Sequence, residues 1–509
     1  MKPTTLATLF DAINLHMLDD VIKTVADLPF GRFCLDSRRI NDGDAFILLS
    51  SVGGGQQSLV RANEYLKSVN DKAAFILSQI DPKELDTSTL SIPIVYLPTI
   101  RYYLGDLIAA RFQANQPAKL PTVVAVTGTN GKTTVSQLVA QLCELSGVPS
   151  AIMGTAGNGR LGRLVQSANT TGDVLAVHEF LYQMALDGVE VVALEASSHG
   201  LHQHRLQGVP VSVAIYTNLS HDHLDYHADM EDYRAAKARL FDEQYFNTLT
   251  HGIINRDATY PLLDKHGVQS YQLLGYACQD ETADYFAKSI MPSLDGVQIE
   301  LLAQGETVHL HSPLLGLFNV DNLMAAVAAF LALYPHQKSN LPALIAQLHG
   351  ARGRMQRVPS RQGSFIVDYA HTPDAIEQVL ISLQKHCTGR LIAVFGCGGD
   401  RDKSKRPIMA SVGVRHADVV ILTADNPRSE DPNAILKDMQ AQLDCEAHYK
   451  VIIEPDRRLA IKEAVAMAGA DDIVVILGKG HETYQEINGV RHDFDDVAVV
   501  GEFIDAFNK

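Results

Sequence analysis

The chain has 509 residues, of which 46% are hydrophobic and 20% are charged, and its formal net charge at pH 7 is −16. At roughly 150 residues per domain this length predicts about three domains, and the composition excludes fibrous and disordered proteins. The acidic balance argues against a protein that coats nucleic acid or an anionic membrane, because such a surface must neutralise phosphates. An anionic ligand must therefore be held by local basic clusters.

Cysteine usage and apolar runs indicate the compartment. Six cysteines are scattered without a CxxC pair, which gives neither a disulfide framework nor a cysteine-rich zinc site. The first eleven residues contain no long apolar run, so we expect no secretory signal. The longest apolar stretch, around residues 323–334, is shorter than the ~20 residues of a membrane span. We expect a cytoplasmic protein that binds neither nucleic acid nor membrane, and we expect a monomer.

The expected elements divide the chain into three α/β parts. Residues 1–120 contain mixed strand-like segments, 45–49 and 74–77 among them, and end at a polar segment with two prolines. In residues 121–350 strands alternate with helices, which predicts a doubly wound parallel sheet like that of P-loop ATPases. Its predicted strands are 123–127, 189–194, 212–216 and 252–255, and its first helix is 132–145. A Rossmann-like third domain, 351–509, has predicted strands at 365–368, 391–395, 419–423, 450–454 and 472–477.

A glycine-containing loop follows the first strand of the central part. The segment Val123–Thr134 is an apolar strand, then a loop, then a Lys-Thr pair that opens a helix. Backbone N–H groups in this order bind phosphates, Lys132 supplies a charge, and the Thr133 hydroxyl can bind Mg²⁺. Val126 stands where the usual motif has its first glycine, and the alternative is a tight turn with an incidental lysine. We expect a nucleoside triphosphate here.

Two further segments suggest a metal. Glu195 ends an apolar run, where a strand would present it to a ligand, and a carboxylate suits Mg²⁺. His221, His223, Asp225 and His227 nearly spell the H-x-H-x-D-H of zinc hydrolases, but Tyr226 shifts the spacing by one residue. A purely structural histidine cluster is the other alternative. Lys237, on the predicted helix 233–241, would by default lie on a solvated face.

The loop 127–134, Thr-Gly-Thr-Asn-Gly-Lys-Thr-Thr, resembles the ATP loop of the Mur ligase family, whose members add amino acids to the peptidoglycan precursor with ATP. Other segments resemble the family in the same order over nearly the whole chain. The resemblance implies that Thr133, Glu195, His223 and a carbamylated Lys237 hold Mg²⁺. It implies an ATP site made of Gly128, Thr129, Asn130, Gly131, Lys132, Thr133, Thr134, Asn319, Asn322, Arg354 and Asp368.

The same resemblance implies a site for a UDP-linked muramoyl peptide. Its residues would be Leu35, Ser37, Asn169, Thr170, Thr171, Ser197, Gln203 and Arg205. The segment 51–57 departs from the family's His-Gln-Ala stretch, so the diphosphate contacts there are not assigned. Asn255-Arg-Asp257 resembles the family's Asn-x-Asp-Asp, with Ala258 in place of the last aspartate.

Three loops that follow predicted strands of the third domain indicate which amino acid the implied ligase adds. Asp425-Asn-Pro-Arg428 resembles the version of this loop that goes with meso-diaminopimelate, whose distal carboxylate the arginine would grip with both nitrogens. L-Lysine lacks that carboxylate. The implied residues are Arg401, Asp425, Asn426, Pro427, Arg428, Gly478 and Glu482. The implied reaction joins meso-diaminopimelate to UDP-N-acetylmuramoyl-L-alanyl-D-glutamate.

Three alternative functions compete with this ligase. A sister ligase of the folylpolyglutamate synthase type should lack the Asp-Asn-Pro-Arg loop. A zinc hydrolase would work without ATP. A non-catalytic nucleotide-binding module would not need segments for the acceptor and the amino acid. For the third-domain loops alone, the alternative is a proline-containing turn with exposed charge.

Overall fold

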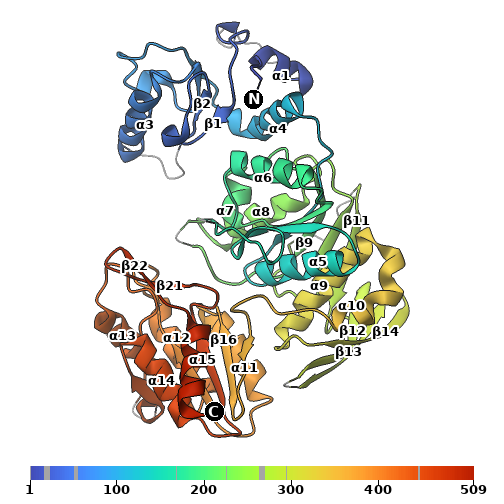
Figure 1. The fold of residues 1–509 in the computed structure, drawn as a ribbon, viewed down its shortest axis with the longest axis vertical. Coiled ribbons are helices and arrows are strands. Elements are labelled where there is room, and N and C mark those ends of the chain that lie inside the picture. The colour runs from blue at the N-terminus through green and yellow to red at the C-terminus, as the bar shows by residue number, and fades with distance from the viewer. Residues whose placement is uncertain are drawn as a thin grey trace.

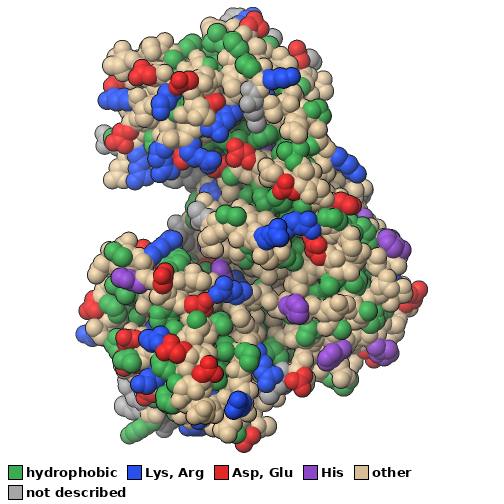
Figure 2. Space-filling view, in the orientation of Figure 1, with side chains coloured by type: hydrophobic (Ala, Val, Ile, Leu, Met, Phe, Trp, Pro, Cys, Tyr) green, Lys and Arg blue, Asp and Glu red, His purple; other side chains and the backbone are tan. Residues whose placement is uncertain are grey.

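The computed structural model describes residues 2–15, 23–50, 56–167, 169–224, 226–262, 270–293, 295–444 and 447–509. Three large sheets follow one another along the chain (Figure 1). The N-terminal part, in blue, sits at one end of the molecule, the central part lies in the middle, and the C-terminal part, in orange and red, lies at the other end (Figure 1). One face is hollowed between the two end parts (Figure 2).

The N-terminal sheet has four parallel strands in chain order: β1 (Phe33–Cys34), β2 (Ala45–Leu48), β3 (Phe75–Ser78) and β4 (Ile94–Tyr96). Alternate residues of β2 enter two different cores, because successive side chains of a strand point to opposite faces. Ala45 and Ile47 pack with α1 (Leu6–Ala12) and α4 (Leu104–Asn115), whereas Phe46 and Leu48 pack on the side of α3 (Gln56–Val69). Both faces are therefore covered, as parallel sheets require.

The central sheet is built around β5 (Thr122–Thr127), which lies between β8 (Val191–Glu195) and β9 (Val211–Tyr216). Further strands are β6 (Ser150–Gly154), β7 (Gly157–Gly159), β10 (His251–Asn255) and β11 (Gln272–Ala277). Helices α5 (Lys132–Leu145), α9 (Phe318–Leu333) and α10 (Leu341–Ile345) cover one face. The other face carries α6 (Val174–Leu186), α7 (Ser198–His202) and α8 (Met230–Ala238).

An antiparallel extension completes this sheet at one edge. It consists of β12 (Tyr285–Ser293), β13 (Gly296–Ala303) and β14 (Glu306–Ser312). The turn between β13 and β14 contains only Gln304 and Gly305, both with positive φ, as a two-residue hairpin requires. These strands were not among those predicted from the sequence.

The C-terminal sheet has the order β15-β16-β20-β17-β18-β19, and all but β15 are parallel. Its strands are β15 (Gln356–Val358), β16 (Ser364–Asp368), β17 (Leu391–Phe395), β18 (Val419–Leu422), β19 (Val451–Ile453) and β20 (Ile473–Leu477). One face packs on α11 (Pro373–Gln384), α12 (Lys405–His416) and α13 (Pro432–Gln440), the other on α14 (Arg457–Met467) and α15 (Asp496–Phe507). A hairpin of β21 (Tyr484–Ile487) and β22 (Val490–Asp493) stands apart.

The predicted fold class, three α/β parts with doubly wound sheets, is confirmed. The predicted strands lie within two residues of the observed ones, and helix 132–145 has the predicted bounds. The helix predicted over 233–241 begins earlier, at Met230, and ends as a 3₁₀ turn over Arg239–Phe241. Within the described residues, no helix has both the length and the apolar character needed to span a bilayer.

Candidate active site

The phosphate loop joins the end of β5 to the start of α5. Gly128 and Gly131 have φ of 151° and 88°, which favours glycine, and a Cβ at Gly131 would collide with the Asn322 amide. Lys132 lies back across the loop and donates to the carbonyls of Gly128 and Thr129, both at 2.9 Å. The end of β9 supports the loop, because Asn218 Oδ1 accepts from the Asn130 N–H at 2.9 Å. The loop is therefore fixed from two strands.

Glu195 ends β8 beside this loop and is buried. Its carboxylate accepts from Thr133 Oγ1 at 3.0 Å and from the Thr155 N–H at 2.8 Å. Burial raises the pKa of Glu195, and the nearby Lys132 charge opposes that rise. A hydroxyl and a carboxylate oxygen are hard donors, so Thr133 and Glu195 fit a Mg²⁺ ion bound with a nucleotide.

Lys237 does not lie on a solvated face, so that default expectation is wrong. Its side chain is 1% exposed, and Nζ donates to the Gly128 carbonyl at 2.8 Å and lies 4.5 Å from the Tyr233 ring centroid. Burial, together with the Lys132 charge, holds the pKa of Lys237 well below its usual range. This environment therefore favours the uncharged amine form of the side chain. Lys237 is buried because it shares the inward face of helix α8 with Tyr233 and Ala236.

Among its described residues, the histidine segment 218–227 does not form the zinc site of the hydrolase alternative. His227 Nδ1 pairs with Asp232 at 3.0 Å instead, and His223 Nε2 lies 3.6 Å from Asp222 Oδ2. Within the described part of the chain, the ligand atoms of His221, His223 and His227 do not gather to within 4.8 Å of one another. Asp225 lies outside the described residues.

A cavity of about 370 Å³ opens between the phosphate loop, α9 and the start of the C-terminal part. Arg354 stacks on the Tyr369 ring at 4.4 Å, and Asp368 accepts from the N–H groups of Met355 and Ala370, both at 2.7 Å. Burial raises the pKa of Asp368, which the Arg354 charge opposes. The predicted ATP residues in the wall are Asn130, Gly131, Thr134, Asn322, Arg354 and Asp368. Gly128, Thr129, Lys132 and Thr133 lie in the loop beside it, and Asn319 accepts from Asn322 Nδ2 at 2.9 Å.

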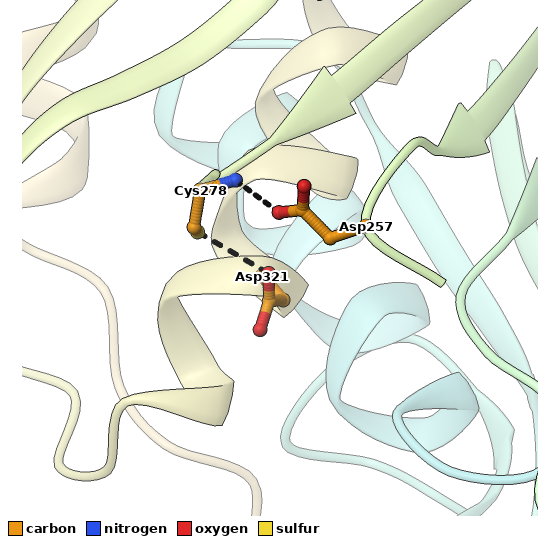
Figure 3. Close-up of side chains that lie close together, drawn as sticks. All are labelled: Asp257, Cys278 and Asp321. Atoms are coloured by element: carbon orange, nitrogen blue, oxygen red, sulfur yellow. Dashed lines mark hydrogen bonds between the residues drawn. The ribbon is translucent and has the colours of Figure 1, made fainter. Parts of the chain in front are cut away.

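The wall of this cavity also carries Asp257, Cys278 and Asp321, which lie close together (Figure 3). Cys278 Sγ donates to Asp321 Oδ1 at 3.2 Å, and the Cys278 N–H donates to Asp257 Oδ2 at 2.5 Å (Figure 3). Asp257 also accepts from the N–H groups of Gln279 and Asp280, both at 3.0 Å, so it fastens the turn after β11. In the described residues, these three are the one group with ligand atoms within 4.8 Å. Burial raises the pKa of Asp321 to about 6.

A second cavity, of about 190 Å³, lies between the N-terminal and central parts. The predicted acceptor residues Leu35, Asn169, Gln203 and Arg205 line it. Threonine hydroxyls connect the residues beside this cavity to Glu195. Thr171 Oγ1 donates to the Glu195 carbonyl at 2.7 Å and accepts from the Ser197 N–H at 3.0 Å. Thr155 Oγ1 likewise donates to Thr170 Oγ1 at 3.1 Å. Ser37 begins a 3₁₀ turn close to Leu35 in sequence, and residues 51–55 lie outside the described residues.

Three loops of the C-terminal part carry the predicted diaminopimelate residues and are called the amino-acid loops below. They meet at the carboxyl ends of β17, β18 and β20, where open α/β sheets bind ligands. Asn426 Nδ2 donates to Glu482 Oε2 at 2.8 Å, and Arg428 Nη1 donates to the Gly399 carbonyl at 2.7 Å. Gly478 has φ of 113°, and a Cβ there would collide with Asp425. Gly398 borders both Arg401 and Arg428, and the Pro427 carbonyl packs on Gly399. All seven predicted residues therefore lie in neighbouring loops.

Residues 126–330 match the Mur ligase middle domain, and residues 353–480 match the Mur ligase glutamate ligase domain. Over 505 residues the chain is 39% identical to the UDP-N-acetylmuramoyl-L-alanyl-D-glutamate–2,6-diaminopimelate ligase of Coxiella burnetii, covering 98% of this chain and 99% of that protein. The chain belongs to the Mur ligase family. It is 40% identical to the ligase of the same name from Xanthomonas oryzae pv. oryzae, over 94% of each chain. A solved structure of a ligase with that name superposes with a TM-score of 0.70 at 40% identity, over 99% of each chain.

Three charged side chains of this Mur ligase escaped the sequence analysis. Lys479, fully buried, donates to Asn426 Oδ1 and to Glu482 Oε2, both at 3.1 Å. Asp222 Oδ1 accepts from Lys405 Nζ at 2.9 Å, which links the central and C-terminal parts. Burial alone would raise the pKa of Asp222, but the His223 and Lys405 charges lower it to about 2. The signal for Lys479 and Asp222 was their position directly beside predicted site residues.

Proposed function

We propose that this Mur ligase joins meso-diaminopimelate to the D-glutamate γ-carboxylate of UDP-N-acetylmuramoyl-L-alanyl-D-glutamate and converts ATP to ADP and phosphate. The observation that carries the proposal is the cluster of Arg401, Arg428 and Glu482 at the strand ends of the C-terminal sheet. Two guanidinium groups and a carboxylate suit an amino acid with carboxylates and amines at both ends. Relatives 39–40% identical over nearly the whole chain bear the name of this reaction.

The first chemical step transfers the γ-phosphoryl group. The γ-carboxylate oxygen of D-glutamate attacks the γ-phosphorus of ATP, the bond to the β-phosphate oxygen breaks, and ADP leaves. Lys132 and the loop N–H groups neutralise charge on the phosphoryl oxygens and hold the two reactants in line. Mg²⁺, when bound at Thr133 and Glu195, supplies further neutralisation of the phosphate charge. His223 and the Lys237 carbamate are the other proposed ligands.

The second step forms the peptide bond. The amine of diaminopimelate attacks the acyl carbon of the resulting acyl phosphate, the C–O bond to phosphate breaks, and the amine loses a proton. The chain uses no nucleophile of its own; the C-terminal part delivers the amine. The Lys405–Asp222 ion pair supports this geometry, because it holds the amino-acid part against the phosphate region.

The chemistry of Lys237 supports its carbamylation. A neutral amine is the form that attacks CO₂, and burial together with the Lys132 charge lowers the pKa of Lys237, which favours that form. The carbamate would replace a group that repels Mg²⁺ with a carboxylate-like oxygen donor. With ¹³C-bicarbonate, the wild-type protein should show one carbamate carbon signal that Lys237→Ala lacks. The same signal in Lys237→Ala would overturn this assignment.

We propose that the reaction takes place in the cytoplasm, because its substrates are nucleotides and amino acids. We also propose a monomer with domains 1–120, 121–350 and 351–509. The proposed function is tested by mass spectrometry of the product formed from ATP, Mg²⁺, the UDP-linked dipeptide and meso-diaminopimelate. Wild type should yield the UDP-linked tripeptide, and Lys132→Ala should yield none. Equal rates for the two proteins would show that the ATP loop is wrongly assigned.

A further inference from the structure

The cavity between the N-terminal and central parts contains an arginine that the sequence analysis did not select. Arg101 lies in a 3₁₀ turn of the N-terminal part, over Ile100–Tyr102, and lines the cavity together with Arg205 of the central part. Its Nη1 donates to the Gln203 carbonyl at 3.2 Å, so its side chain spans the boundary between the two parts. Lys and Arg side chains also gather on the edge of the N-terminal part that faces the hollow (Figure 2).

The partners of both arginines are neutral. Arg101 donates from Nε to Gln79 Oε1 and from Nη2 to the Ser50 carbonyl, at 2.9 and 2.7 Å. Arg205 donates to the Thr171 carbonyl and to Gln203 Oε1, at 2.9 Å from Nη1 and 2.8 Å from Nη2. A guanidinium has five N–H donors, so each arginine keeps N–H groups for a ligand.

The charges in this cavity are unbalanced. Asp173 is the one carboxylate among the lining residues, and no ion pair joins it to either arginine within the described residues. Burial lowers the pKa of Arg101, and the neighbouring Arg205 charge lowers it further. Two half-buried guanidinium groups that repel each other are stabilised by an anion placed between them. The lining therefore carries one cation more than it has anions, which favours an anionic ligand.

We propose that Arg101, together with Arg205, binds the diphosphate of the UDP-linked acceptor. This inference rests on the proposed function. Within the implied acceptor site we assign Leu35 to the uridine end and the Thr171 and Ser197 hydroxyls to the peptide end. The diphosphate joins these two ends of the substrate, and Arg101 stands in the cavity wall with Leu35 and Gln203. The segment 51–57 of this chain contains no basic side chain that could bind the diphosphate, so we assign that role to Arg101.

The test compares Arg101→Gln, Arg101→Lys and a control, Arg61→Gln, which removes an exposed positive charge from α3 of the same part. For Arg101→Gln the KM of the UDP-linked dipeptide should rise about 10- to 100-fold, the range for a lost charge-assisted hydrogen bond, with kcat and the KM of ATP nearly unchanged. Arg101→Lys should lie between it and wild type, and Arg61→Gln should match wild type.

Competitive inhibition by UDP and by uridine identifies the group that Arg101 contacts. Arg101→Gln should weaken inhibition by UDP about 10-fold or more and leave inhibition by uridine unchanged. An equal loss for both inhibitors would overturn the diphosphate assignment, as would an unchanged KM for the dipeptide. If Arg101→Gln does not fold, the UDP-to-uridine ratio of Arg101→Lys decides in the same way. Failure of wild type to bind the UDP-linked dipeptide would refute the proposed function instead.

Discussion

A buried ion pair between Arg457 and Asp496 stabilises the start of the amino-acid loop that follows β20. Both side chains are fully buried, and two hydrogen bonds of 2.8 and 2.7 Å join the guanidinium to the carboxylate. Arg457 Nη2 also donates to the carbonyl of Leu477 at 2.9 Å, directly before Gly478. The pair therefore connects α14 and α15 to the end of β20. Asp496→Ala would leave the guanidinium buried without its hydrogen-bonded carboxylate.

The expected cost follows from this burial. Removing one partner of a fully buried pair costs about 3–5 kcal/mol of unfolding free energy. In a unit of about 150 residues this lowers the melting temperature by roughly 6–20 °C. The double variant Arg457→Met/Asp496→Leu has no buried charge at these two positions and loses mainly the hydrogen bond to Leu477, about 1 kcal/mol. It should therefore be more stable than the single variant.

Differential scanning calorimetry is the appropriate assay, because the chain contains no tryptophan for fluorescence. Asp505→Ala, at an exposed position of the same helix, serves as the control and should change stability by less than about 0.5 kcal/mol. Asp496→Ala should also raise the KM of diaminopimelate and leave that of ATP unchanged. The reasoning is refuted if Asp496→Ala melts within about 2 °C of wild type, or if the double variant is the less stable one.

Three further predictions concern single side chains. Arg428→Lys should raise the KM of diaminopimelate about tenfold or more in steady-state assays with the KM of ATP unchanged, since an ammonium cannot grip a carboxylate with two nitrogens; an unchanged KM would contradict the role of Arg428. Lys479→Met should raise the same KM, because Asn426 and Glu482 lose their shared donor, and equal kinetics for variant and wild type would count against it. Asp321 has a folded-state pKa of about 6 against 3.8 for the free group, so its protonated form favours folding and its contribution to stability falls as pH rises from about 4 through 6. Calorimetry at pH 4.5 and 8 should show a smaller loss of stability in Asp321→Asn than in wild type, and parallel losses would contradict the assigned pKa.

Most of the parallel strands were predictable, because they are short apolar runs bounded by glycine, proline or polar residues. The parallel strands β1, β4, β6 and β11 were not predicted, and neither were β12, β13 and β14. In β13 and β14, exposed positions occur between buried ones, and the charged and polar residues concealed the pattern. The two-residue turn at Gln304 and Gly305 was the local signal that could have revealed the hairpin.

The residues of the candidate site were largely selected from motifs, and the structure brings most of them to two cavities and one set of loops. Motifs identify residues that are close in sequence. They could not show that Lys237 is buried, since helix α8 faces inward only because of packing against distant strands. Arg101 and Lys405 were missed for a related reason: each reaches its partner across a boundary between parts of the chain.

The proposed reaction is decided by phosphate release from the wild-type chain with ATP, Mg²⁺ and UDP-N-acetylmuramoyl-L-alanyl-D-glutamate, comparing meso-diaminopimelate with L-lysine. Release with diaminopimelate and only background with lysine is the predicted result, since lysine has no distal carboxylate for Arg428. Release with lysine at an equal or higher rate would contradict the assigned amino acid, and release with neither would contradict the ligase itself.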